Sequence, residues 1–384
     1  MIQLIVLAWF ASIQLSTAGL PRWMLIQGRT LGSSGEPAFG LINDVVADSA
    51  GNTYVLDSKA DPFVYAFAPD GRLRWSAGRR GDGPGEFQQP RVLGMHKESL
   101  WISDVRLRRF TWVRLNGLIL KDVIVLPNSP NPRVRQSVPF ALTKDGNVLV
   151  MDIGHPNSSR IGMALLHGKL SEVSADSLAF IERGQTFVEA RISVNGTAGH
   201  GQFQQAFTDD PLVQPAKDGA SIVIVDQKRN SSDNVPTFTV TKLSPRGDTV
   251  FSRQIPYSRE LLKDQQYVAA LEEIAQMPSR LRPGVVVSMD DLKSNSYRPH
   301  YLPPVKSLAV ASDGTIWIHR HTPTNTSSYL VLGIDGNPIA TTEVPRGQRV
   351  IESNGSTVWT LPIRHDQESI VSSYRIERPK ERRQ

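Results

Sequence analysis

Short stretches in which apolar and polar residues alternate recur along most of the chain, and turns that contain glycine separate them. The first set comprises residues 41–48, 52–57, 63–68 and 73–77, with turns at Ala50-Gly51 and Asp70-Gly71. Alternation with a period of two, together with such turns, is typical of antiparallel strands joined as hairpins. The pattern therefore predicts a unit of four antiparallel strands.

This unit recurs along the chain. Its first turns fall near residues 51, 98, 146, 219, 314 and 355, so successive units are 47, 48, 73, 95 and 41 residues apart. The short spacings agree with the roughly 40–50 residues of a four-stranded propeller blade. We therefore expect an all-β protein, a six-bladed β-propeller of four-stranded blades that spans residues 19–378.

The two long spacings require insertions. One is the polar region between about residues 170 and 205, and the other covers about 257–301. In the second, residues 258–276 place apolar side chains at helical spacing after Ser258 and before Pro278, which predicts an amphipathic helix capped by the serine and stopped by the proline. We therefore expect a helical insertion between blades four and five that lies across the rim or caps the channel.

A glycine-rich connector follows the first unit and recurs elsewhere. Gly83-Pro-Gly-Glu-Phe-Gln-Gln89 is repeated almost unchanged as Gly199-His-Gly-Gln-Phe-Gln-Gln205. Glycine tolerates φ > 0 and proline fixes its own φ, so both segments are predicted to be tight connections between strands. A strand rather than a helix start is predicted after the glycines, which disfavours a nucleotide phosphate site.

The sixth unit has three predicted strands, and the N-terminus supplies the fourth. Arg22-Trp23, Gly28-Arg29 and Gly35-Glu36 repeat the series Arg74-Trp75, Gly78-Arg79 and Gly85-Glu86 at the end of the first unit. We therefore expect residues 23–27 to pair antiparallel with residues 370–375, and Trp23 or Leu25 to be buried against blade six or one. Such closure removes an open sheet edge.

The first residues predict export. Residues 2–15 are apolar apart from Gln3, Ser12 and Gln14, and Ser16-Thr17-Ala18 offers small residues to a signal peptidase. The run is shorter than the ~20 residues of a membrane span, so residues 1–18 are predicted to be a cleaved signal peptide of a periplasmic or secreted protein, with no span afterwards. No basic residue precedes the run, which leaves an uncleaved anchor as the alternative. The chain has no cysteine, so disulfides and a lipidated cysteine are excluded.

Composition and charge alter this picture little. The chain has 384 residues, 40% of them hydrophobic and 21% charged, which is ordinary for a globular protein. The net charge of +6 is mild, and part of it lies in the basic tail at residues 379–384. We therefore expect no nucleic-acid partner, and we expect a monomer.

The connector and the strands that follow it resemble those of a known class of propeller. Gly-Pro-Gly-Glu-Phe-x-x-Pro, an apolar strand, and aromatic-x-x-Asp strand ends at residues 54–57 and 101–104 are similar to the NHL-repeat class of six-bladed propellers. Residues 299–318 resemble exported propeller proteins of environmental bacteria. The resemblance implies the fold but not an activity, because the class includes protein-binding sensors, RNA-binding modules, lactonases with a central divalent metal and an amidating lyase.

Two sets of residues suggest metal binding. Four aspartates that end the second strand of their units are Asp57, Asp104, Asp152 and Asp226. Aspartate at such a position usually caps a neighbouring turn, and we prefer this structural interpretation to a ring of metal ligands. His319 and His321 lie two residues apart on a predicted strand, which would turn both to one face, but no third ligand at a recognisable spacing accompanies them.

Charged residues are also predicted at the mouth of the central channel. Counting back from each first turn places Asp44, Arg91, Lys306 and Arg349 near the mouth-facing ends of the innermost strands. Three cations and one carboxylate favour an anionic or zwitterionic ligand. The alternative is that these charges only hydrate the channel or pair with one another.

Two functions remain open on the sequence. The first is an extracytoplasmic binding or interaction scaffold that presents a site for a protein, a peptide or a small anionic ligand on the face carrying the insertions. The second is a metal-dependent hydrolase, similar to a lactonase, or a lyase that uses a divalent metal in the channel. No Gly-x-Ser-x-Gly elbow occurs, so a serine hydrolase of that type has no support.

Overall fold

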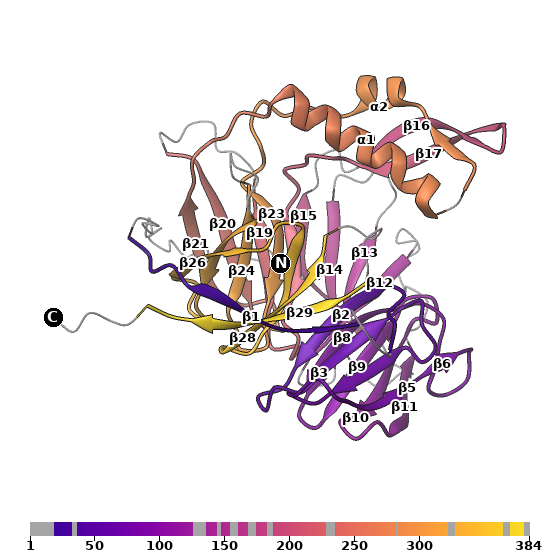
Figure 1. The fold of residues 1–384 in the computed structure, drawn as a ribbon, viewed down its shortest axis with the longest axis vertical. Coiled ribbons are helices and arrows are strands. Elements are labelled where there is room, and N and C mark those ends of the chain that lie inside the picture. The colour runs from indigo at the N-terminus through magenta and orange to yellow at the C-terminus, as the bar shows by residue number, and fades with distance from the viewer. Residues whose placement is uncertain are drawn as a thin grey trace, which may run out of the picture.

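The computed structural model describes residues 19–32, 37–125, 136–143, 147–153, 160–167, 174–182, 187–227, 235–281, 283–321, 327–363 and 369–379. Within these ranges lie six four-stranded antiparallel sheets, one three-stranded sheet and two helices (Figure 1). The six larger sheets are the blades of a propeller, which confirms the predicted fold class. Neither helix is long and apolar enough to cross a membrane. The predicted signal peptide at residues 1–18 and most of the basic tail lie outside the described residues.

Each blade runs from an innermost to an outermost strand. The innermost strands, in chain order, are β2 (Ile42–Ala47), β8 (Pro90–His96), β12 (Gln136–Leu142), β18 (Leu212–Pro215), β23 (Val305–Val310) and β27 (Gln348–Ser353). The second strands are β3 (Thr53–Asp57), β9 (Ser99–Asp104), β13 (Val148–Ile153), β19 (Ile222–Asp226), β24 (Ile316–Arg320) and β28 (Thr357–Pro362). The third strands are β4 (Val64–Phe67), β10 (Arg109–Arg114), β14 (Arg160–His167), β20 (Thr237–Leu243), β25 (Ser327–Leu332) and β29 (Val371–Glu377). The outermost strands are β5 (Leu73–Ala77), β11 (Ile119–Val125), β15 (Ser174–Glu182), β21 (Thr249–Pro256), β26 (Pro338–Val344) and, in the sixth blade, β1 (Met24–Leu31).

The N-terminal strand closes the ring. In Figure 1 the indigo β1 runs alongside the yellow β29, and the antiparallel register pairs Met24 with Glu377 and Gln27 with Tyr374 before an irregularity at residues 28–29. This confirms the predicted pairing, which extends further than expected along both strands. β1 is therefore the outermost strand of the sixth blade, beside β29.

Trp23, just before β1, is buried between blades five and six. Its indole is buried and meets Trp317 of blade five edge to face, with ring centroids 6.0 Å apart. Its backbone N–H donates to Thr341 O of β26 at 2.9 Å, and its carbonyl accepts from the Thr342 hydroxyl at 2.9 Å. The buried cluster around Trp23 also contains Val350 and Val358 of blade six, and Leu25 is packed against it, so the expected burial against blade six is confirmed and contacts with blade five are added to it.

Buried apolar residues lie between neighbouring blades. Between blades one and two, for example, Tyr54 and Leu56 of β3 pack with Leu100 and Ile102 of β9. A corresponding cluster between blades four and five contains Phe238 and Ile318. Because successive side chains of a strand point to opposite faces of the sheet, the middle strands of a blade contribute to the clusters on both sides. The core is therefore a ring of interfaces between blades.

Asp104 and Arg109 hold the connector between blades one and two. The short parallel strands β6 (Arg79–Arg80) and β7 (Glu86–Phe87) flank its turn. Asp104 Oδ2 accepts from the N–H groups of Gln88 and Gln89 at 2.7 and 3.0 Å, and the Arg109 guanidinium donates to the carbonyls of Asp82 and Gly83 at 2.8 and 2.7 Å. Both side chains thus satisfy backbone groups of the loop, which strands alone would leave unpaired.

Asp57 has the same role one blade earlier. Its two carboxylate oxygens accept hydrogen bonds from four backbone N–H groups, those of Gly40, Leu41, Lys59 and Ala60. For Asp57 and Asp104, therefore, the structural interpretation of the strand-end aspartates agrees with the contacts. The side chain of Asp152 lies outside the described residues, and Asp226 is exposed at the end of β19.

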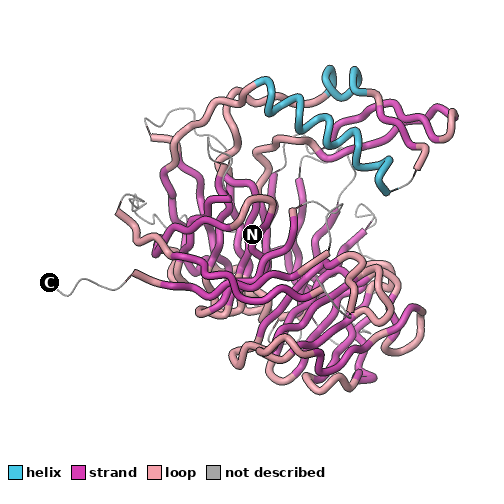
Figure 2. Tube along the Cα trace, viewed as in Figure 1, coloured by secondary structure: helices cyan, strands magenta, loops and turns pink. Residues whose placement is uncertain are grey.

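The two insertions combine into one unit, which we call the insertion subdomain. The first supplies the hairpin β16 (Phe187–Val194) and β17 (Thr197–Gln204), and the second supplies α1 (Asp264–Leu281), β22 (Val285–Val287) and α2 (Met289–Asn295). β22 pairs with β16, and Leu292 of α2 is buried with Val188 of β16. The helices lie together at one end of the molecule (Figure 2). The predicted helical insertion between blades four and five is confirmed.

Two details of the insertions differ from the expectations. Residues 199–204 belong to strand β17 rather than to a connector, because β16 provides a full antiparallel partner for them. The helix begins at Asp264 instead of after Ser258, since Leu262 N–H donates to His300 O at 3.2 Å and Leu261 bridges to Tyr301. It continues through Pro278 to Leu281, so the proline does not stop it.

Candidate functional site

A buried ion pair crosses the propeller axis. Lys217 follows β18 of blade four and donates through Nζ to Asp44 Oδ1 of blade one, and both side chains are buried. Blades one and four face each other across a six-bladed ring, so the pair spans the centre. Lys217 also accepts a hydrogen bond through its carbonyl from Met95 N–H of blade two at 3.0 Å.

Glu352 of blade six is the third member of this group, which we call the axial ion cluster (Asp44, Lys217 and Glu352). Its side chain is fully buried and accepts from Ser312 N–H, the Ser312 hydroxyl and Ser353 N–H at 2.7, 2.9 and 2.7 Å. Burial raises the pKa of Glu352 to about 8, and Lys217 and the hydrogen bonds oppose this shift. The cluster thus links four blades around the axis through titratable groups removed from water, of which Glu352 keeps its proton below about pH 8.

Glu352 is expected to make the stability depend on pH. Its folded-state pKa of about 8 exceeds its ordinary value of 4.5, so the folded protein retains a proton that the unfolded chain releases. This contribution to stability is complete below about pH 4.5 and is lost as the pH rises toward about 8. The free energy of unfolding should therefore fall across this range by up to about 5 kcal/mol more in the wild type than in Glu352→Gln.

Urea denaturation of both proteins across this pH range measures the difference. The two share their histidines and all other carboxylates, so those contributions cancel. Glu272→Gln, which changes an exposed glutamate on α1, is the control and should follow the wild type. Parallel pH profiles for the wild type and Glu352→Gln would show that Glu352 holds no such proton.

The four residues predicted from the inner strands have different surroundings. Asp44 is occupied, because Oδ1 accepts from Lys217 and Oδ2 accepts from Leu93 N–H at 3.0 Å. Burial lowers the pKa of Arg349, and Asp44 opposes that shift, so Arg349 lies within electrostatic range of the axial ion cluster. Lys306 is half-buried on β23, and burial lowers its pKa. Arg91 is exposed at the start of β8.

Arg91 and Lys306 share a backbone feature. Each is the extra residue of an irregularity in the pairing of its inner strand, between Pro90 and Val92 in β8 and between Val305 and Ser307 in β23. A bulge bends the strand and redirects the side chain at that position. The bulge therefore fixes the direction of one side chain at the start of each of these two strands. Counting residues from a turn gives the position of a residue on the strand but not the direction of its side chain.

His319 and His321 lie at the end of β24 and are both uncharged near neutral pH. Burial lowers the pKa of His319 to about 4 and that of His321 to about 3, with the charge of Lys306 contributing to both shifts. His319 stacks on Tyr329 with ring centroids 4.7 Å apart, and its Nε2 is buried without a hydrogen-bond partner among the described residues. Throughout the described ranges, no three histidine, aspartate or glutamate side chains gather into a metal site.

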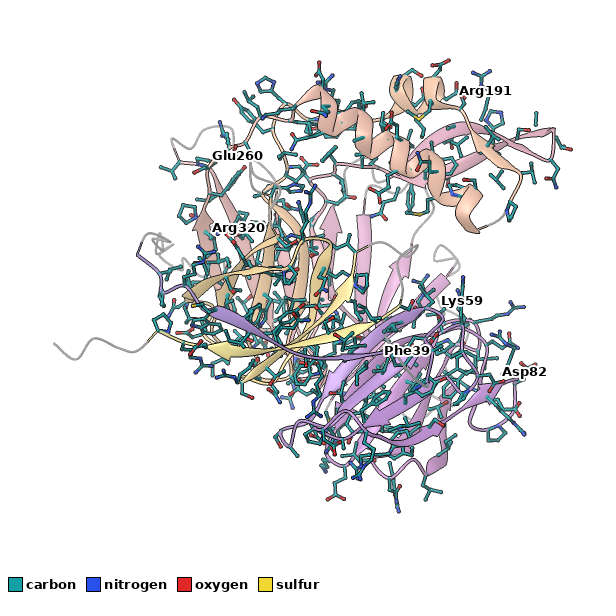
Figure 3. The ribbon with its side chains drawn as sticks, in the orientation of Figure 1. Phe39, Lys59, Asp82, Arg191, Glu260 and Arg320 are labelled. Atoms are coloured by element: carbon teal, nitrogen blue, oxygen red, sulfur yellow. The ribbon has the colours of Figure 1, made fainter. Side chains whose placement is uncertain are left out.

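A cleft of about 390 Å³ opens where blades four and five meet the insertion subdomain. Tyr257 extends from the end of β21, and Arg320 and His321 extend from the end of β24. The segments that enter and leave the second insertion add Ser258, Glu260 and residues 302–304. Figure 3 shows Glu260 and Arg320 on the same side of the molecule, with Glu260 nearer the helices.

Among the described residues, the two charged groups of this cleft form no ion pair. Arg320 Nη2 donates to the Ser328 hydroxyl at 3.3 Å, whereas its Nε is buried without a partner in the described part of the chain. Glu260 lines the same cleft, and among the described residues its carboxylate forms no hydrogen bond or ion pair. The cleft therefore holds one cation and one carboxylate, each available to a ligand.

Sequence patterns did not identify Lys217, Arg320 or Glu260 as site residues. Lys217 precedes Asp218-Gly219, where a lysine is ordinarily exposed on a turn. Arg320 occupies the strand-end position that an aspartate occupies in four other blades. Glu260 lies in the segment predicted to begin a helix, but the helix begins only at Asp264. A basic residue that replaces the capping aspartate in one blade was the one available signal.

Comparisons with known proteins give distant structural likenesses. No family model matches the chain, and no curated protein matches its sequence. A putative exported protein from Bacteroides fragilis has a TM-score of 0.46 at 11% identity, covering 95% of this chain and 98% of that one. The corresponding values are 0.43, 12%, 92% and 96% for regucalcin, a calcium-binding protein from Agrobacterium tumefaciens, and 0.42, 12%, 90% and 98% for virginiamycin B lyase from Staphylococcus aureus. Other similar structures are a streptogramin B lyase, a gluconolactonase from Xanthomonas campestris and a protein of unknown function from Bacteroides thetaiotaomicron, and likenesses this distant carry no argument about activity.

Proposed function

We propose that the protein is an extracytoplasmic binding scaffold that holds a small anionic ligand in the cleft between blades four and five. The observation that carries this proposal is Arg320, which lines the cleft with its Nε buried and unpartnered among the described residues. A buried donor without a partner is unfavourable by about 1–3 kcal/mol, and a ligand carboxylate would supply the missing acceptor. The planar guanidinium also suits carboxylates, which it binds through two parallel hydrogen bonds.

The surroundings of Arg320 support an anion. Burial lowers the pKa of His321 to about 3, so its ring is uncharged near neutral pH. In this form it can still donate one N–H hydrogen bond to an anion. The Ser258 hydroxyl lines the same cleft. The positive charge of Lys306 acts on His321, as the shift in the histidine pKa records. These groups together favour negative charge on the side of the cleft that blade five forms.

The cellular setting is part of the same proposal. Export rests on the apolar run at residues 2–15 and the small residues that follow it. Membership of the NHL-repeat class rests on the Gly-Pro-Gly-Glu-Phe connector. A monomer agrees with the closed ring, in which β1 covers the edge that β29 would otherwise expose.

The rival function, a metal-dependent hydrolase or lyase in the channel, has less support. Asp44 and Glu352 are already occupied by Lys217 and backbone donors. His319 and His321 have no third metal-binding side chain beside them in the described ranges. We therefore place the ligand in the cleft rather than on the axis.

Thermal unfolding with simple anions tests the proposal. Acetate, benzoate and succinate at millimolar concentration, compared with chloride at equal ionic strength, should raise the Tm of the wild type by a few degrees for at least one anion. Arg320→Gln should lose this rise. Arg246→Gln, which changes an exposed arginine on a turn of blade four, is the matched control and should retain it. An equal rise in Arg320→Gln would contradict the proposal, and so would the absence of a rise both with these anions and with compounds that carry an ammonium beside the carboxylate.

A further inference from the structure

We infer that the cleft selects a small zwitterion, a free amino acid or a dipeptide, whose carboxylate binds Arg320 and whose ammonium binds Glu260. This inference rests on the proposed function and deepens it by naming the class of ligand. It depends on the two opposite charges that share one cavity and on the way the backbone keeps them apart.

Elsewhere in this protein, opposite charges that face each other form pairs. Arg191 and Asp291 in the insertion subdomain are joined at 2.7 Å, and Lys217 and Asp44 are joined on the axis. Arg320 and Glu260 line the same cleft, yet no ion pair joins them to each other or to any other charged group among the described residues. The cleft therefore presents separated positive and negative charges.

Both charged residues stand on anchored backbone, which keeps their separation. Arg320 ends β24, where it pairs with Val305 of β23 and Ser328 of β25. The carbonyl of Glu260 accepts from Leu302 N–H at 2.8 Å, and its neighbour Leu261 bridges to Tyr301. Arg320 thus belongs to blade five, and Glu260 belongs to the segment between β21 and α1. A ligand with both charges would contact Arg320 of blade five and Glu260 of the segment between β21 and α1.

The remaining walls suit the rest of such a ligand. Apolar surface in the same cleft comes from Val235, Pro256, Leu302, Pro303 and Pro304. A volume of about 390 Å³ is near the lower end of the range for small-molecule sites, which is roughly 300–1,000 Å³. A dicarboxylate would place its second negative charge near Glu260, and an anion without an ammonium would leave Glu260 unpaired. Amino acids and dipeptides with apolar side chains fit all three features.

Binding of blocked and unblocked compounds tests this inference. The probes are leucine, valine, phenylalanine, proline and dipeptides of these residues, each compared with its N-acetyl form and its methyl ester by thermal shift and isothermal titration calorimetry. We expect at least one free compound to bind, and both of its blocked forms to bind about 10-fold to 100-fold more weakly, because each lacks one charge-assisted hydrogen bond.

Two variants assign the charges to the residues. In Glu260→Gln the free and N-acetyl compounds should bind about equally, and in Arg320→Gln the free compound and its ester should bind about equally. Glu272→Gln, an exposed glutamate on α1, is the matched control and should discriminate as the wild type does. Discrimination against the N-acetyl form that survives in Glu260→Gln would overturn the assignment.

The outcomes separate this inference from the proposed function. If simple carboxylates bind through Arg320 and a free ammonium brings no advantage, the inference is wrong and the proposed function stands. If neither carboxylates nor zwitterions bind, both are wrong. If a zwitterion binds and both variants lose the corresponding discrimination, both are supported.

Discussion

A chain that begins at Arg29 is expected to melt far below one that begins at Gly19. The deletion removes the part of β1 that pairs Met24–Gln27 with residues 374–377, and it removes the buried indole of Trp23 from its site against Trp317. Loss of a buried tryptophan side chain alone costs about 3–5 kcal/mol, and the ladder hydrogen bonds add to it. Against a total stability of ~5–15 kcal/mol, such a loss is large. Thermal unfolding and size-exclusion chromatography measure the effect.

Two variants show whether closure is responsible for the loss. Trp23→Ala should account for part of it while leaving the strand in place. Met24→Ala changes the neighbouring residue, whose side chain is 59% exposed, and should leave the Tm near that of the wild type. The edge of β29 that the deletion exposes should also promote aggregation. A monomeric truncated protein with an unchanged Tm would mean that β1 contributes nothing to the ring.

Lys217→Met is expected to destabilise the protein by about 3–5 kcal/mol, because it leaves the buried carboxylate of Asp44 without its cation. The methionine keeps similar bulk, so most of the loss should be electrostatic. Only 4% of the Lys217 side chain and 6% of the Asp44 side chain are exposed, so water cannot replace the missing partner. Urea denaturation at pH 7 measures the change through the shift of the midpoint.

A double variant separates two contributions to the loss of stability, the lost attraction between Lys217 and Asp44 and the unpaired buried carboxylate that remains. Lys217→Met with Asp44→Asn removes both charges and should be more stable than Lys217→Met alone, since no unpaired ion remains on the axis. The surface pair of Arg22 and Glu343, with exposed side chains, serves as comparison, and Arg22→Met should change stability by less than about 1 kcal/mol. A Lys217→Met variant as stable as Arg22→Met would contradict the buried cluster.

The blades could be predicted because their local signals agree with the tertiary structure. Gly51, Gly71 and Gly314 all adopt φ values between 81° and 84°, the region that the hairpin turns require and that glycine tolerates. The alternating residues between those turns become the buried faces of the blades. Closure by β1 was visible for the same reason, since Arg22-Trp23 repeats the end of the first blade.

The positions of the two insertions could be predicted from the sequence. Their strand pairing could not, because the strands that pair are distant in sequence. Residues 199–204 share letters with the connector near Gly83, yet they pair with β16, which in turn pairs with β22 nearly a hundred residues later. A repeated motif cannot indicate which strand will lie beside it. The same applies to Ser258, whose capping tendency is overridden by the pairing of Leu261 with Tyr301.

The candidate site was only partly predictable. Asp44 and Arg349 could be placed on their inner strands by counting from a turn, and their role in ligand binding stays a prediction. Lys217 was missed because a turn lysine carries no sign that its side chain will be buried. Arg320 and Glu260 were missed because the cleft forms only when the second insertion returns to blade five, which no local pattern specifies.

Ring closure also determines the order in which this chain can mature. Among the described strands, β1 is synthesised first and its partner β29 last, so their pairing closes the longest loop between any two of these strands. Until the last strand is available, blade six lacks its third strand and Trp23 lacks the neighbouring sheet that completes its burial. Pairing of such distant segments is slow and leaves unpaired strand edges exposed in the meantime. The ring of blades can therefore close only after β29 has been synthesised.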